Sequence, residues 1–430
     1  MIRAAQIFSV TILTSFAIFP FFFSFLPGIN TKMFLAVFGL LAFGFDYRNG
    51  IVTQFTDKFI KLTLWAVGVS FCSLLTMVIN DTPDNSYLTF VMSFWVWLFA
   101  SYCCVYLMRC VHGKISIATI SYYLMAVALL QCVAAILMYR IPYLEDLFTH
   151  FITGERYMGI GIGTARLHGI GCALDVGGGR IGAILIMIAY LIILNLKQKA
   201  QKWKLLGLIM GFFFIMVCGN MMGRTASVGA AIAIVYATYR IITDRQIAEA
   251  SKISLIKLLS VCLIIGSSLC VLLYNTNDSF YTLFRFGFEG FFNYFEYGKF
   301  ETHSTDMLSE GMIFPDNLKT WIIGDGYMAG VANDPYYIGP SDYGFYMNTD
   351  AGYSRFIFYF GLVGLSSICA FMICTCKECI GKLRYTSFLF LSMLLLNFAI
   401  WIKVSTDLFV MFAPFLCLDD ESLYESSMVH

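Results

Sequence analysis

Apolar runs long enough to cross a bilayer recur along the whole chain and are separated by polar segments. Runs of this length and composition predict membrane-spanning helices. The fold class that we expect is an all-α integral membrane protein, folded as a single polytopic domain over residues 1–430. We expect about twelve spanning helices, at residues 5–25, 31–45, 59–79, 88–108, 115–139, 180–196, 205–222, 225–239, 258–274, 351–373, 387–402 and 406–418.

The composition agrees with this pattern. Hydrophobic residues make up 59% of the chain, charged residues only 13%, and the mean hydropathy is +0.76, which excludes an ordinary soluble protein. The apolar stretch after Arg3 is long for a signal peptide and no A-x-A site follows it, so we expect an uncleaved first helix. Membrane lipids are therefore expected partners, and nucleic acid is not.

Charge sets the expected orientation. With a cytoplasmic N-terminus, the inner segments hold 17 of the 28 Lys and Arg residues and nine of the 27 acids, which gives +8 inside and −7 outside. The excess of Lys and Arg predicts that both termini are cytoplasmic. Two long segments, residues 140–179 and 275–350, are then extracytoplasmic loops.

The expected outer side is rich in arginine rather than lysine. A planar guanidinium suits bidentate phosphate recognition, so a lipid-linked phosphate is the anion that we expect on this side. Arg224 is the first candidate, because it stands alone between two apolar runs and is held close to the membrane. The seven arginines of this side are Arg140, Arg156, Arg166, Arg180, Arg224, Arg285 and Arg355.

Other readings of these basic residues stay open. Arg166 is either an anion ligand or a snorkelling arginine. Arg355 is either a phosphate ligand or part of a buried ion pair, and Lys403 contacts either a pyrophosphate or Asp407. Arg180 is interpreted as an ordinary charge at the start of a helix. The glycines at 177–179 precede that helix and predict a tight turn or a close helix approach.

The segment 275–350 is rich in aromatic, amide and acidic residues. Rings stack on the C–H faces of sugars and polar groups bind hydroxyls, so this composition favours glycan binding. Trp321, Tyr327 and Tyr353 are the candidate glycan contacts. Asp350 is either a helix N-cap or a base for a sugar hydroxyl.

The order of several motifs resembles the Wzy-type O-antigen and capsular polysaccharide polymerases, within the superfamily that also contains the O-antigen ligases. The resemblance covers most of the chain. At the place of the outer-loop histidine typical of the ligases, this chain has Asp350, which favours a polymerase. The motifs are Arg166-Leu167-His168-Gly169, Gly223-Arg224-Thr225, Gly324-Asp325-Gly326-Tyr327, Asp350-Ala351-Gly352-Tyr353-Ser354-Arg355 and the late Lys403.

This resemblance implies a GT-C-type membrane glycosyltransferase that polymerises undecaprenyl-pyrophosphate-linked repeat units into O-antigen, capsular or exopolysaccharide. It would act on the periplasmic face of the bacterial inner membrane, with a chain-length regulator as a further partner. An O-antigen ligase that transfers glycan to lipid A core, and a secondary transporter, are the alternatives.

The roles expected in such an enzyme follow from the chemistry of the leaving group. Pyrophosphate needs cationic stabilisation, and arginine takes the part of a metal, so no metal or cofactor is expected. Arg224, Arg166, Arg355 and Lys403 would hold the pyrophosphate. The candidates for the group that accepts the proton of the acceptor hydroxyl are, in order, Asp350, Asp325 and His303.

Overall fold

The structure is a computed structural model that describes residues 2–50, 53–153, 166–198, 201–302, 305–306, 312–328, 345–381 and 386–418. About 78% of it is helical, and eight of the described helices are long and apolar enough to cross a membrane. The chain is therefore an all-α membrane protein. The eight helices are α3 (Thr53–Asn80), α4 (Phe90–His112), α5 (Ile117–Arg140), α7 (Leu174–Lys197), α8 (Lys202–Met222), α9 (Thr225–Thr243), α10 (Glu249–Thr276) and α15 (Gly352–Ile380).

The other four expected spans also contain helices. These are shorter or more polar: α1 (Ile2–Ile18), α2 (Thr31–Arg48), α16 (Ser387–Ile400) and α17 (Phe409–Leu416). The expected boundaries of two of these spans are wrong. The last helix begins at Phe409 rather than at 406.

The first helix ends at Ile18 rather than at 25, because Pro20 disfavours helical backbone at the residue before it. The chain then forms β1 (Phe22–Phe23) and β2 (Leu26–Asn30), which join β3 (Ile152–Thr153) in a small antiparallel sheet of order β2-β1-β3.

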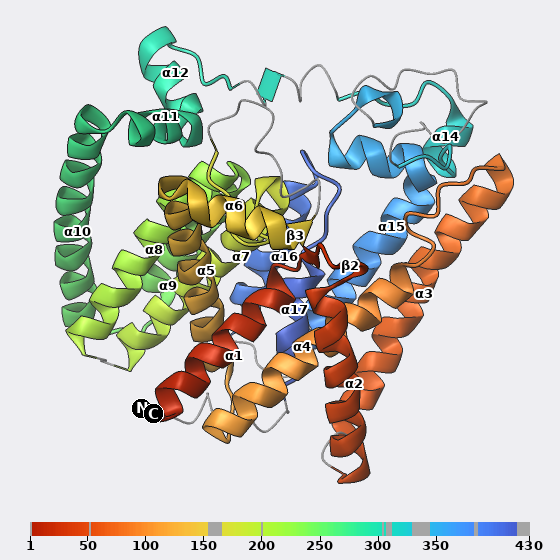
Figure 1. Cartoon of the computed structure of the whole chain (residues 1–430), viewed down its shortest axis with the longest axis horizontal. Helices are drawn as coiled ribbons and strands as arrows, with labels where there is room; N and C mark the ends of the chain where they lie inside the picture. The colour runs from red at the N-terminus through yellow and green to blue at the C-terminus, as the bar shows by residue number, and fades with distance from the viewer. Residues whose placement is uncertain are drawn as a thin grey trace.

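The helix α7 is the centre of the bundle. Of its apolar stretch 89% is buried, against 6% for α10, which lies on the rim (Figure 1). The helix packs against α5, α8, α9 and α16. It begins at Leu174 and not at 180 as expected, so the three glycines at 177–179 and Arg180 lie inside a buried helix.

Glycines let α7 and α9 touch backbone to backbone. A Cβ added to Gly229 of α9 would lie 2.1 Å from the Cα of Gly182 in α7. A Cβ added to Gly178 would lie 2.3 Å from the hydroxyl oxygen of Thr225, the first residue of α9. The close helix approach expected from the glycines at 177–179 is confirmed, and it brings the starts of α7 and α9 together.

The helix α15 is interrupted at Phe360 and Gly361. Gly361 has a φ of 64°, a backbone conformation that favours glycine. The carbonyls of Phe358 and Tyr359 accept hydrogen bonds from the backbone N–H groups of Asp325 (2.6 Å) and Gly326 (3.0 Å). The Gly324-Asp325-Gly326 motif is therefore a turn that supplies donors to the broken helix.

The two segments expected to be extracytoplasmic loops contain further helices. They are α6 (Pro142–Phe151), α11 (Asp278–Gly287), α12 (Glu289–Tyr297), α14 (Leu318–Ile322) and a 3-10 turn, η2 (Tyr346–Asn348). Figure 1 shows α11 and α12 on one side, and α14 on the other side, of the end of the molecule away from the N-terminus. The segments 140–179 and 275–350, which the sequence predicts to be extracytoplasmic loops, thus contain helices of their own.

Candidate functional site

Arg224 lies in the tight connection between α8 and α9. It is the N-cap residue of α9, one residue after Gly223, which caps the end of α8. A Cβ added to Gly223 would lie 2.4 Å from the carbonyl oxygen of Leu174, so this connection is pressed against the start of α7. The guanidinium forms an ion pair with Glu289, the first residue of α12. Arg224 is therefore fixed between α8 and α9, with a carboxylate from a distant helix against it.

Arg166 lies beside Arg224. Its guanidinium carbon is 4.6 Å from the ring centroid of Phe286, and that of Arg224 is 4.9 Å from the same centroid. A hydrogen bond of 3.0 Å from the Leu167 N–H to the Met221 carbonyl ties the Arg166 segment to the end of α8. Two guanidiniums from separate segments thus share one aromatic ring of α11.

The carboxylates of Asp175 and Glu289 offset the repulsion between these two cations. Burial lowers the pKa of Arg166, the nearby Arg224 lowers it further, and the charges of Asp175 and Glu289 act in the opposite direction. The side chain of Thr225 donates a hydrogen bond of 3.1 Å to the Asp175 carbonyl, which fixes the start of α7 against the start of α9.

Lys403 extends this group of charges through Asp175. Its Nζ lies 3.2 Å from a carboxylate oxygen of Asp175. The simple Lys403–Asp407 pair considered from the sequence is wrong for the described residues, because the chain between α16 and α17 directs Lys403 towards α7.

Asp350 lies close to the same charges. Burial and the charge of Asp175 raise the pKa of Asp350, whereas Arg355 and Lys403 act to lower it. The N-cap interpretation of Asp350 is wrong, because Ala351 is the N-cap residue of α15 and no side chain caps that helix. The carboxyl group instead lies beside two cations, Arg355 and Lys403, and a second acid, Asp175.

Arg355 lies in the first turn of α15. It donates a hydrogen bond of 2.9 Å to the Met328 carbonyl, and its guanidinium carbon is 4.4 Å from the ring centroid of Phe345. Arg355 does not share the Phe286 ring, and Asp350 and Lys403 connect it electrostatically to the other cations. We call the whole group the arginine cluster: Arg166, Asp175, Arg224, Glu289, Asp350, Arg355 and Lys403.

Asp325 belongs to a different part of the structure. Its carboxylate accepts hydrogen bonds from the hydroxyls of Thr320 (2.6 Å) and Tyr346 (3.1 Å), and Lys319 lies 3.4 Å away. These contacts give Asp325 a structural role at the end of α14. The sequence predicts Asp325 as a candidate base because it cannot show that Thr320, Tyr346 and Lys319 contact this carboxylate.

The three candidate glycan contacts each pack against a different neighbour. Trp321 donates a hydrogen bond of 2.8 Å to the Pro315 carbonyl and stacks on a neighbouring phenylalanine. Tyr327 stacks on Tyr346, with the ring centroids 5.2 Å apart. The Tyr353 hydroxyl donates to the Phe398 carbonyl at 3.0 Å, so Tyr353 packs against α16. His303 lies outside the described residues.

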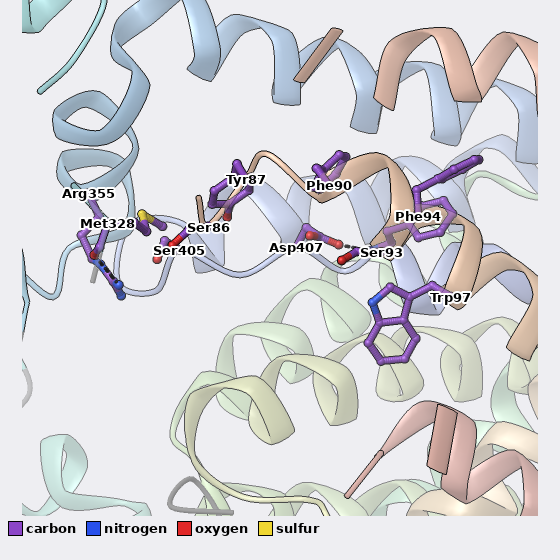
Figure 2. A pocket seen from close by; sticks show the side chains of 11 residues that line it. Ser86, Tyr87, Phe90, Ser93, Phe94, Trp97, Met328, Arg355, Ser405 and Asp407 are labelled. Atoms are coloured by element: carbon purple, nitrogen blue, oxygen red, sulfur yellow. Dashed lines mark hydrogen bonds between the residues drawn. The ribbon is translucent and has the colours of Figure 1, made fainter. Parts of the chain in front are cut away.

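A cavity of about 380 Å³ begins at Arg355 and extends between α4 and the segment that joins α16 to α17 (Figure 2). Its wall contains aromatic rings, hydroxyl groups, a carboxylate and the guanidinium of Arg355. It is lined by Ser86, Tyr87, Phe90, Ser93, Phe94, Trp97, Met328, Arg355, Ser405, Asp407 and Phe409.

A second group of charges, not foreseen from the sequence, lies at the far end of this cavity. Arg180 is only 9% exposed, and it donates a hydrogen bond of 2.7 Å to the Ile18 carbonyl. Its guanidinium carbon is 5.2 Å from the ring centroid of Trp97, and the Lys32 Nζ is 3.9 Å from the same centroid. Burial raises the pKa of Asp407, and both cations act to lower it.

The interpretation of Arg180 as an ordinary charge at a helix start is therefore wrong. It depended on a helix beginning at 180, and the true start at Leu174 carries Arg180 into the bundle. A signal for this group was present in the sequence, since charges between apolar segments of a membrane protein are costly and usually paired.

Comparison with models of protein families finds none that matches this chain. A search of curated proteins finds none with significant similarity to it.

Proposed function

We propose that this protein is a membrane glycosyltransferase of the GT-C type that polymerises undecaprenyl-pyrophosphate-linked repeat units into O-antigen, capsular or exopolysaccharide. The observation that carries the proposal is the position of Arg166 and Arg224 on one phenyl ring at the mouth between α8 and α9. Two guanidiniums held together in this way form a preorganised site for a phosphate or pyrophosphate group.

The chemistry of the leaving group supports this assignment. Departure of a lipid pyrophosphate develops negative charge, and fixed cations aimed at that charge stabilise the transition state. Arg166 and Arg224 supply this stabilisation, and Lys403 adds a third cation through its contact with Asp175. In the substrate complex the phosphate takes the place of Glu289 beside Arg224.

Asp350 is the proposed base. Desolvation and the charge of Asp175 raise its pKa, which makes the carboxylate a better proton acceptor, while Arg355 and Lys403 favour its charged form. An acceptor hydroxyl placed between Asp350 and the arginines gives up its proton while the pyrophosphate leaves.

The proposed topology has twelve spans, α1–α5, α7–α10 and α15–α17, with both termini in the cytoplasm of a bacterium. The arginine cluster then faces the periplasm, where lipid-linked repeat units are presented. Figure 1 is compatible with this topology, because α11, α12 and α14 lie at the end away from the N-terminus.

The test compares two arginines that both pair with glutamates of α12. Arg224 pairs with Glu289, and Arg285 of α11 pairs with Glu296 at 2.7 Å. Arg224→Ala should reduce polymer formation about a hundredfold or more, since it removes a donor to the leaving group. Arg285→Ala should leave the ladder of polymer on a gel unchanged. Full-length polymer from a well-expressed Arg224→Ala protein refutes the assignment.

The same gel separates the proposed polymerase from a ligase. A polymerase gives a ladder on undecaprenyl pyrophosphate, whereas a ligase gives glycan attached to lipid A core.

A secondary transporter is the second candidate, because two observations favour it. The helix α15 is interrupted, and Arg180, Lys32 and Asp407 form a buried charge group, as in transporters with broken helices. The carbonyls next to the break are however paired with the α14 turn, which favours the glycosyltransferase. Purified protein in liposomes distinguishes them, since a transporter moves solute without joining repeat units.

A further inference from the structure

The cavity beside Arg355 combines two kinds of surface that carbohydrate sites use. Tyr87, Phe90, Phe94, Trp97 and Phe409 present aromatic rings. Ring faces pack against the C–H groups of a sugar, while hydroxyl and carboxylate oxygens bind its hydroxyl groups.

The polar groups of the cavity lie on different elements. Ser93 lies on α4, and Ser405 and Asp407 lie on the segment between α16 and α17. Figure 2 shows the side chains of Asp407 and Ser93 close to each other, with Trp97 at one end and Arg355 at the other. A ligand in this cavity therefore meets hydrogen-bonding groups from two sides.

The carboxylate of Asp407 is fixed in place. One of its oxygens accepts a hydrogen bond of 2.9 Å from the Phe409 N–H. Arg180 and Lys32 lie against Trp97. Burial raises the pKa of Asp407, and these two cations act in the opposite direction. A carboxyl group held in this way offers fixed oxygen atoms for hydrogen bonds with the hydroxyl groups of a sugar.

The size of the cavity restricts its ligand. About 380 Å³ lies near the lower end of the range of small-molecule sites, which is about 300–1,000 Å³. This volume suits one or two sugar rings. Its carboxylate, hydroxyls and guanidinium make it unsuitable for a polyprenyl chain, which has no group to pair with them.

We infer that this cavity binds the terminal sugar of the acceptor glycan, with Asp407 and Ser93 as ligands of its hydroxyl groups. The inference rests on the proposed function, and it adds the acceptor subsite to it. Arg355 lines the cavity and is an electrostatic neighbour of Asp350. A sugar in the cavity therefore has its outer hydroxyl at the mouth, beside the proposed base and the arginine cluster.

The first test fills the cavity and measures binding directly. The probe is the free oligosaccharide released by mild acid from the lipid-linked repeat unit of the host cell, titrated into purified full-length protein. Ser93→Phe should weaken binding at least tenfold, because the new ring occupies the sugar's place. The matched control is Ser267→Phe, which places the same ring on an exposed face of α10. Unchanged affinity in a folded Ser93→Phe protein overturns the inference.

The second test replaces the carboxyl group of Asp407 with an amide. Asp407→Asn should weaken oligosaccharide binding about tenfold or more, because the amide replaces one acceptor oxygen with an NH2 donor. Asp278→Asn, on an exposed residue of α11, should have no effect. If Asp407→Asn does not fold, Ser93→Phe still decides the question, because it leaves every charge in place.

Binding and polymerisation report on different claims. If Ser93→Phe abolishes oligosaccharide binding and the wild-type protein makes no polymer, the sugar site is supported and the polymerase is refuted. Normal polymer from Ser93→Phe and Asp407→Asn refutes the acceptor subsite and leaves the polymerase standing.

Discussion

At the scale of single residues, the arrangement around Phe286 is the most informative. Two guanidiniums within 5 Å of one ring centroid repel each other, and Glu289 and Asp175 offset this repulsion. The ion pair with Glu289 means that Arg224 has an internal anion in place of an external one. An external phosphate therefore competes with a carboxylate.

Removing that competitor should strengthen anion binding. Glu289→Gln should bind inorganic pyrophosphate about tenfold more tightly than the wild type, because Arg224 no longer has to leave a charged partner. Titration calorimetry measures this affinity. Glu296→Gln, which breaks the Arg285 pair instead, is the control and should not change it. Equal affinities for wild type and Glu289→Gln would contradict the anion site.

Asp350 should make stability depend on pH. Its pKa is raised by burial, so the folded protein favours the protonated form and loses stability as pH rises through that pKa. Asp350→Asn resembles the protonated form at every pH. We expect this variant to melt about 1–2 °C above the wild type at neutral pH and equally at acid pH. A lower melting temperature at neutral pH would show that Arg355 and Lys403 outweigh the burial.

At the scale of elements, the contact between α7 and α9 determines where the arginine cluster lies in the bundle. The approach of Gly182 and Gly229 brings Asp175, Thr225 and Arg224 to the same end of the bundle. Glycine is needed here because any side chain at 229 would meet the backbone of α7.

This contact gives a direct stability prediction. Gly229→Ala should lower the melting temperature by about 3–8 °C, since overpacking typically costs about 1–3 kcal/mol. Gly266→Ala, on α10, adds the same methyl group where nothing lies within 4 Å, and it should be neutral or stabilising. Thermal unfolding in detergent checks both. A Gly229→Ala protein as stable as the wild type would mean that the two helices can separate at no cost.

The elements themselves were largely predictable, and their contacts were not. Apolar runs placed a helix in each expected span, because length and hydropathy alone decide that property. The start of α7 was missed because three glycines resemble a turn in the sequence, whereas a tightly packed neighbour makes them favourable in a helix. Arg166 and Arg224 flank helices that are close in sequence, so the sequence could predict that these two arginines lie near each other. Glu289, Asp175 and the Asp407 group depend on which distant segments pack together, which no local pattern shows.

At the scale of the whole molecule, charge and shape divide it into two ends. Ion pairs such as Lys61–Glu378 and Lys197–Asp244 lie in the segments that the charge pattern predicts to be cytoplasmic. The arginine cluster lies among the segments expected on the other side. The proposed function requires these two ends to be on opposite faces of the membrane.

This topology is testable with a native cysteine. Cys110 is exposed at the end of α4, which the proposed topology places in the cytoplasm. A membrane-impermeant maleimide should label Cys110 only after the membrane is opened. The additional labelling seen after opening should be absent in Cys110→Ser. Labelling of Cys110 in intact spheroplasts would invert the orientation and with it the proposed face of the reaction.

The position of α10 on the rim has a consequence for the surrounding bilayer. This helix packs mainly against α8 and α11, and only 6% of its apolar stretch is buried, so lipids set much of its tilt. The chain continues from α10 directly into α11 and α12, which carry Phe286 and Glu289 to the arginines. In the proposed enzyme, acyl-chain length and membrane thickness therefore act on the arginine cluster through α10.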